Sequence, residues 1–249
     1  MNVAKPHMLR RWSCATAGVV AMLLGAPRAR AELIDVQFSG VFSLPCNCSH
    51  VNPSQSGAAV VGEAGDQWND FAASSASDQV LLTVNGAATG VTLSFSSASR
   101  PYTAEADYDA FTGTPWANLM QGYLVNDIQI SLSGLIPDAT YGFYVYDQGD
   151  DNSPGRAVTF DINGSDPQTA AQTNASSFIL NNNYVYLQGV AGTSGDITID
   201  ETGDKGEADV NGFQMVLVSA PEPSTLAILL VSMLGLGMVR WRRLPGRTV

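Results

Sequence analysis

The chain has 249 residues, 45% of them hydrophobic, and a formal net charge of −11. Residues 32–220 contain 22 acidic residues and only three basic ones, Arg100, Arg156 and Lys205, which gives this body a net charge of −19. A body this acidic repels nucleic acid and anionic lipid, which argues against both as partners.

The first 31 residues have the three parts of a secretory signal peptide. Residues 1–11 carry one lysine and two arginines, and residues 13–26 form an apolar stretch that is too short to span a membrane comfortably. Ala29-Arg30-Ala31 then supplies the small residues of a cleavage site before Glu32. We therefore expect the protein to be exported by the secretion machinery, with residues 1–31 removed.

The body, residues 32–219, has the length of one domain with a sizeable core. Its sequence is rich in glycine, serine, threonine and asparagine, and short alternating apolar segments are separated by turn residues. This pattern predicts an all-β fold, a single jelly-roll-like β-sandwich, with a short helix within residues 117–125. The expected strands are 33–39, 58–61, 80–84, 91–95, 127–132, 140–147, 156–162, 177–180, 184–187, 196–199 and 213–218.

Cys46 and Cys48 are the two cysteines of the body, and His50 is its one histidine. Export favours oxidation, although a disulfide that spans a single residue is strained. The alternatives are free or intermolecular thiols, or a soft-metal site in which His50 joins the two thiols. A closed zinc site would need a fourth ligand.

Aromatic side chains of the body are candidates for sugar stacking, although most aromatics of a sandwich belong to its core. Trp68 lies in the segment 65–71, whose two aromatics are expected to dock on the core. Trp116 lies in the polar segment Thr114-Pro115-Trp116 and is expected to be the more exposed of the two. Trp68 and Trp116 are therefore the candidate ligand residues.

Two acidic loops are candidates for Ca²⁺, which prefers oxygen ligands on flexible loops. The first loop holds Asp147, Asp150 and Asp151, and the second holds Glu201, Asp204, Glu207 and Asp209. Neither loop has the EF-hand spacing, so solvated turn carboxylates are the simpler interpretation. The acidity of the whole body has the same two explanations, solubility or binding of divalent cations that bridge to an acidic polysaccharide. We expect no cofactor other than this candidate Ca²⁺.

Four segments between residues 127 and 218 resemble bacterial galactose-binding-like jelly rolls. They are the tyrosine-rich Thr140–Tyr146, the hairpin Val158–Gly164, the strand Gly195–Ile199 and the closing Asn211-Gly212-Phe213-Gln214. The residues that carry the resemblance are mostly glycines in turns and apolar residues on the core-facing sides of strands. The resemblance therefore implies the fold, and it implies no ligand residue.

The end of the chain combines an apolar run, Leu226–Val239, with three arginines that follow it. Residues 224–241 would form a helix about 27 Å long, close to the thickness of the hydrocarbon layer. Flanking arginines snorkel to the interface and keep their side of the membrane cytoplasmic. We therefore predict a transmembrane helix over about 224–241, with the body outside.

This tail, residues 220–243, resembles the PEP-CTERM sorting signal, in which a Pro-Glu-Pro segment, an apolar helix and an arginine cluster follow one another. The resemblance implies that exosortase recognises the tail and processes it near Pro221–Ser224. The alternative is a plain membrane anchor. The residues that carry the resemblance are Pro221, Glu222, Pro223, Ser224, Arg240, Arg242 and Arg243.

These features predict an exported, exosortase-sorted protein of the cell envelope or extracellular matrix, with a structural or adhesive role beside exopolysaccharide. A carbohydrate-binding module, assisted by Ca²⁺, is the alternative. We do not expect an enzyme, because the body has one histidine and no recognisable catalytic motif. A carboxylate-based enzyme acting on glycans is the third hypothesis.

Overall fold

The computed structural model describes residues 32–43, 49–51, 53–98, 101–103, 110–126, 128–149, 157–171, 175–203 and 209–221. The predicted signal peptide, the tail beyond Pro221 and the pair Cys46 and Cys48 lie outside these ranges. Within them, no helix has the length and apolar character needed to cross a membrane. The same ranges contain no lysine or arginine, because all three basic residues of the body lie outside them.

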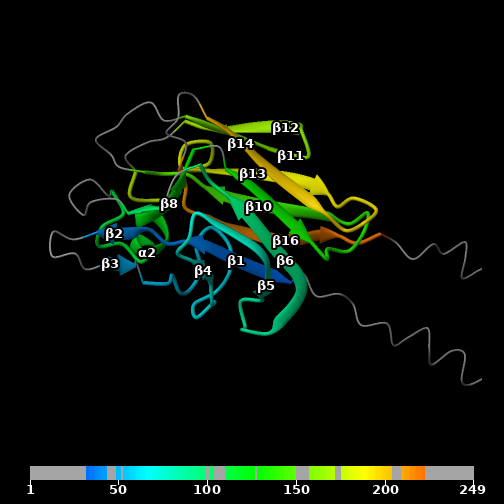
Figure 1. Ribbon diagram of the computed structural model, residues 1–249, viewed down its shortest axis with the longest axis horizontal. Coiled ribbons are helices and arrows are strands. Elements are labelled where there is room, and N and C mark those ends of the chain that lie inside the picture. The colour runs from blue at the N-terminus through cyan, green and yellow to red at the C-terminus, as the bar shows by residue number, and fades with distance from the viewer. Residues whose placement is uncertain are drawn as a thin grey trace, which may run out of the picture. The chain divides into compact units, whose positions relative to one another are not determined.

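Two large β-sheets form most of the described body, beside a three-stranded and a two-stranded sheet (Figure 1). The five-stranded sheet has the order β13-β10-β16-β1-β4, and the six-stranded sheet has the order β12-β11-β14-β9-β6-β5. The strands of the first are β1 (Leu33–Phe38), β4 (Asn69–Phe71), β10 (Thr140–Tyr146), β13 (Tyr184–Val190) and β16 (Gly212–Ser219). Those of the second are β5 (Ser75–Leu82), β6 (Ala88–Ser96), β9 (Gln129–Ser133), β11 (Val158–Ile162), β12 (Ser165–Ala170) and β14 (Ile197–Gly203).

The smaller elements gather at one end of the strands in Figure 1, and β16 runs toward the other end. They are β2 (Val41–Ser43), β3 (Ser49–Val51), β7 (Tyr102–Thr103), α2 (Ala117–Gln121), β8 (Gly122–Val125) and β15 (Asp209–Val210). From β9 onward the chain passes repeatedly from one large sheet to the other. This alternation, with mostly antiparallel neighbours, confirms the predicted all-β, jelly-roll-like sandwich.

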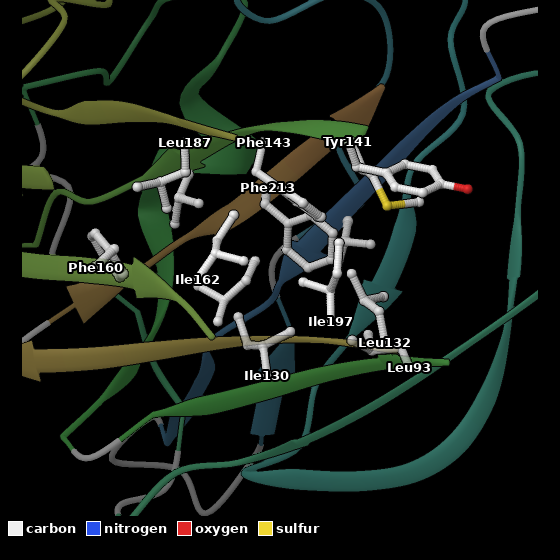
Figure 2. Packing of buried hydrophobic residues seen from close by; sticks show 14 of the residues in the cluster. Leu93, Ile130, Leu132, Tyr141, Phe143, Phe160, Ile162, Leu187, Ile197 and Phe213 are labelled. Atoms are coloured by element: carbon white, nitrogen blue, oxygen red, sulfur yellow. The ribbon is translucent and has the colours of Figure 1, made fainter. Parts of the chain in front are cut away.

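The core lies between the two large sheets (Figure 2). On β10, Tyr141, Phe143 and Val145 point into it, and they share one face of the strand, as the alternation of the sequence predicts. Phe213 of β16 meets Phe143 at a ring-centroid distance of 6.2 Å. The six-stranded sheet supplies the opposite wall with Leu93, Ile130, Leu132, Phe160, Ile162 and Ile197.

Two of the expected strands are absent from the described residues, and their backbone groups bond to side chains instead. In the segment 58–61, the Val60 amide donates to the Tyr146 hydroxyl at 3.1 Å. In the segment 177–180, the Ile179 amide donates to the Asn183 side-chain oxygen at 2.8 Å. Strand β12 was not predicted; it contains Pro167 and lies at a sheet edge, where proline is tolerated.

The expected helix occupies only the first half of its predicted range. It ends at Gln121, and the chain continues at once as β8. The two aromatics of the segment 65–71 dock as predicted, since Trp68 is buried and Phe71 packs against Phe95 at 5.6 Å. The segment was predicted as a loop or turn, but residues 69–71 form β4, which pairs with β1.

One edge of the sandwich closes where β13 meets β11 of the opposite sheet. A Cβ added at Gly189 of β13 would lie 2.4 Å from Cγ2 of Ile162. Since Ile162 is buried and its β-branched side chain is restricted in χ1, it cannot rotate away to make room for the added methyl group. The two sheets can therefore approach this closely only at a glycine.

We expect Gly189→Ala to lower the free energy of unfolding by about 1–3 kcal/mol, because it overpacks this edge. Gly192→Ala is the matched control, since the nearest atom to its added Cβ is 3.6 Å away. Urea unfolding of both variants measures the difference. Equal stability of the two variants would contradict the close approach of β13 and β11.

Candidate functional site

The five-stranded sheet has an outer face, turned away from the core, that carries aromatic and polar side chains. The strand registers place them in two rows that cross the sheet from β13 to β1. The first row is Tyr186, Tyr144, Gln214 and Asp35, and the second is Tyr184, Tyr146, Gly212 and Gln37. An outer face of an exposed sheet is normally polar, so four tyrosines in adjacent positions need a physical explanation.

Part of this face lies beneath a second hydrophobic cluster, made of Trp68, Phe111, Leu119, Met120 and Tyr146. These residues come from β10, α2 and the two segments 57–68 and 111–116. Phe178 completes the cover and packs 5.1 Å from the Tyr146 ring. Tyr146 is consequently fully buried, although it lies on the outer side of its sheet.

We call residues 57–66 the covering loop, and four side chains of the body bond to its backbone. The indole nitrogen of Trp68 donates to the Gly57 oxygen at 2.9 Å, and that of Trp116 donates to the Ala58 oxygen at 3.1 Å. The Tyr146 hydroxyl accepts from the Val60 amide. The Gln214 amide bonds both backbone groups of Val61, with distances of 3.0 and 3.1 Å.

Asp35 lies at the end of this network and is completely buried. Its Oδ1 accepts from the Gln214 side-chain nitrogen at 3.0 Å, and the Tyr146 hydroxyl donates to the Gln214 oxygen at 2.5 Å. No described residue donates to the Asp35 Oδ2 atom. The described part of the chain also offers no lysine or arginine that could neutralise it.

Burial raises the pKa of the Asp35 carboxyl to about 7 from an ordinary value of 3.8. The hydrogen bond from Gln214 lowers this pKa, and the neighbouring charge of Asp66 raises it, but desolvation dominates. Burial likewise raises the pKa of Tyr146 well above its ordinary value, which keeps its hydroxyl a hydrogen-bond donor.

The other part of the outer face is open and centres on Tyr144 and Tyr186, which are half-buried. Their ring centroids are 4.8 Å apart with an interplanar angle of 43°. The Tyr186 ring leans over Gly142, where an added Cβ would lie 2.7 Å from the Tyr186 hydroxyl oxygen. The exposed Gln188 donates from its side chain to that hydroxyl at 2.7 Å. The result is an aromatic surface edged by an amide.

The two candidate tryptophans do not lie on this open surface. Trp68 is only 8% exposed, so its ring faces the second cluster. Trp116 is half-buried and packs against Phe178 at 5.1 Å. Each indole nitrogen is already bonded to the covering loop. Trp68 and Trp116 therefore belong to the aromatic cover, whereas Tyr144 and Tyr186 lie on the open part of the face.

The acidic candidates are buried or lie outside the described ranges. Asp147 is fully buried at the end of β10, whereas Asp150 and Asp151 lie outside. In the second loop, Glu201 and Asp209 are buried, while Asp204 and Glu207 lie outside. Among described residues no group of three or more histidine, cysteine or acidic side chains is placed to hold a metal ion. The Ca²⁺ prediction therefore stays a prediction.

The closing motif Asn211-Gly212-Phe213-Gln214 has a structural role at every described position. The buried Asn211 amide donates at 2.9 Å to three backbone oxygens, those of Met120, Gly122 and Gln148. A Cβ at Gly212 would lie 2.2 Å from the Val36 oxygen. Phe213 enters the core and Gln214 holds the covering loop. The motif thus fixes the outer face, and its Gln214 is the cross-strand neighbour of Tyr144.

Comparison with known proteins does not give the chain a family. No protein-family model matches it, and no curated protein matches it. The similar solved structures include protein YxiM of Bacillus subtilis, with 13% identity, a TM-score of 0.38 and 76% of this chain covered. The plant receptor-like kinase ANX2 has 10% identity and a TM-score of 0.35 over 52% of this chain. This chain spans 40% and 43% of the length of those two proteins.

A family 35 carbohydrate-binding module of Clostridium thermocellum is also similar, with 15% identity and a TM-score of 0.29. The match covers 49% of this chain and 100% of the module. Similarity at this level assigns no function to the present chain.

Because the pKa of Asp35 is raised in the folded chain, the stability of the chain depends on pH, and the direction of the pKa shift sets the sign. The folded state holds the Asp35 proton more tightly than the unfolded state, so this contribution to stability is complete below pH 3.8 and is lost as the pH rises to about 7. At about 1.4 kcal/mol per pKa unit, the loss amounts to about 4 kcal/mol at most. Asp35→Asn removes the ionisation.

We therefore expect the stability of Asp35→Asn relative to the native chain to increase by about 3–4 kcal/mol between about pH 4 and about pH 7. Asp138→Asn, at an exposed position, serves as the control and should show no such trend. Denaturant unfolding at several pH values measures both differences. Parallel curves for the two variants would refute the assignment of a buried, high-pKa carboxyl.

Proposed function

We propose that the open part of the outer face, around Tyr144 and Tyr186, binds a glycan, and that the protein is a non-catalytic, exported binding component of an exopolysaccharide matrix. The observation that carries this proposal is the half-buried tyrosine pair above Gly142, edged by the Gln188 amide. Tyrosine ring faces pack against the C–H groups of sugar rings. Amide and phenol groups hydrogen-bond to sugar hydroxyls. Binding sites commonly combine such an apolar surface with a few fixed polar groups.

The charge distribution supports an uncharged glycan over an anionic one. The body carries a net charge of −19, and the described ranges hold no lysine or arginine that could pair with a uronate or sulfate. An anionic chain would therefore be repelled at long range. Asp35, the carboxyl in the same row as the two tyrosines, lies fully buried, which favours binding over acid–base catalysis at this surface.

The proposed adhesive role rests on the tail as well as on the sandwich. The chain leaves β16 at Ser219, and exposed residues lead to Pro221. The segment that resembles the PEP-CTERM signal begins there. We propose that exosortase processes this segment and releases the sandwich into the matrix, where its tyrosine surface holds polysaccharide.

Tyr186→Ala should reduce affinity for a neutral polysaccharide at least tenfold, because it removes one stacking ring. A tenfold loss of affinity corresponds to about 1.4 kcal/mol of binding free energy. Gly142→Ala should reduce affinity as well, because its Cβ displaces the Tyr186 ring without removing it. Tyr102→Ala is the matched control, since Tyr102 is 39% exposed on β7 and belongs to another sheet. Affinity electrophoresis of the full chain in gels containing neutral or anionic polysaccharide measures the effect. Equal retardation of all three variants would refute the site.

Replacing Pro221, Glu222 and Pro223 by alanine should leave the C-terminal segment attached, whereas the native chain should lose it. Mass spectrometry of the protein recovered from its own cells locates the C-terminus in each case. Replacing Ser194, exposed in a loop outside the segment that resembles the sorting signal, by alanine provides the control and should not alter processing. A native C-terminus that remains at Val249 would contradict the sorting proposal.

A further inference from the structure

Two of the four side chains that bond to the covering loop, those of Tyr146 and Gln214, connect it to one buried carboxyl. The indoles of Trp68 and Trp116 bond to its first two residues independently of that carboxyl. Val60 bonds to the Tyr146 hydroxyl, and Val61 bonds to the Gln214 amide. Tyr146 and Gln214 bond to each other, and Gln214 donates to Asp35. Because Gln214 uses its nitrogen for Asp35 and Val61 at the same time, the attachment of the loop and the state of the carboxyl are coupled.

The loop itself carries a like charge close to that carboxyl. Asp66 is only 8% exposed, and its Oδ2 accepts from the Glu63 amide at 2.7 Å. It is the carboxylate whose charge acts on Asp35. From β10 the facing titratable group is Tyr146, and β16 contributes the neutral Gln214. The described residues provide no cation on any of these elements.

A protonated Asp35 is neutral, and its burial beneath the loop costs little. An ionised Asp35 leaves the charged Oδ2 buried without a donor among the described residues, and it faces Asp66. Water can reach Oδ2 only if the cover above the sheet opens, and opening also separates the two carboxylates. Desolvation and repulsion therefore act in the same direction.

We propose that Asp35 is an acid-closed latch, whose protonated form holds the covering loop, residues 57–66, against the sheet and whose ionisation releases it. The native protein thus has a closed state at acidic pH and a more open state near neutral pH. The moving element is the loop that carries Val60, and Val60 packs in the same cluster as Tyr144. If the tyrosine surface binds glycan as proposed above, the latch also adjusts the border of that site, and this consequence rests on the proposed function.

Hydrogen exchange of the full chain, followed by mass spectrometry of peptides from residues 57–66, tests the latch without any glycan. After correction for the intrinsic exchange rate, the protection of this loop should fall roughly tenfold per pH unit from about pH 4 to about pH 7 and then level off. In Asp35→Asn the protection should not vary with pH. Asp138→Asn should behave like the native chain, and the peptide of β10 should keep its protection in all three proteins.

Two results would overturn the latch. One is a native loop whose corrected protection is constant between about pH 4 and about pH 7. The other is the same fall in Asp35→Asn, which would assign the pH dependence to another group. The native curve alone decides the first outcome, so the test remains decisive even if Asp35→Asn folds poorly. Loss of glycan binding with an intact exchange profile would count against the proposed function and leave the latch standing.

Discussion

The hydrogen bond between the Tyr146 hydroxyl and the Gln214 amide, 2.5 Å long and fully buried, is the contact on which the outer face depends. It joins the neighbouring strands β10 and β16 by side chains as well as by backbone. It also orients the Gln214 amide so that its nitrogen reaches Asp35 and the Val61 oxygen. Buried polar groups are stable only when they are bonded, so this single orientation determines where the covering loop can lie.

This constraint divides one sheet face into two parts with different properties. Where the loop, α2 and Phe178 cover the sheet, Tyr146 and Trp68 become a second hydrophobic core. Where the cover ends, Tyr144 and Tyr186 keep part of their ring surface accessible to solvent. Tyr146 of the covered part and Tyr144 of the open part come from the same alternating strand, β10. The cover alone decides which of them support the fold and which can meet a ligand.

Local sequence patterns were sufficient for the sandwich but not for the cover. The alternation in Thr140–Tyr146 predicts Tyr141, Phe143 and Val145 on one face and Tyr144 and Tyr146 on the other, and the structure turns the first set toward the core. The segment 58–61 was predicted as a strand because it is apolar. Its backbone partners are instead Tyr146 and Gln214, which lie 86 and 153 residues away in the chain. The alternation of residues within one short segment carries no information about contacts with such distant residues.

The sequence indicated that a candidate site would be made of aromatic side chains, but it did not indicate the residues that we propose. Aromatic stacking was predicted at Trp68 and Trp116 and stays a prediction there, whereas the surface that we propose is formed by two tyrosines on adjacent strands. Gly142, in the middle of a tyrosine-rich strand, was the available signal, since a glycine within a strand often marks a close approach. Asp35 gave no such signal. A single acid in an alternating strand normally faces water, and its burial becomes visible only when the distant loop is in place.

The most direct test of this division is an NMR titration of the tyrosine-labelled full chain with a neutral oligosaccharide. The account predicts that the ring signals of Tyr144 and Tyr186 shift on binding, while those of the buried Tyr146 and of Tyr102 on another sheet do not. Shifts confined to Tyr102, or an absence of any shift at saturating sugar, would contradict the assignment of a binding surface to the open part of this face.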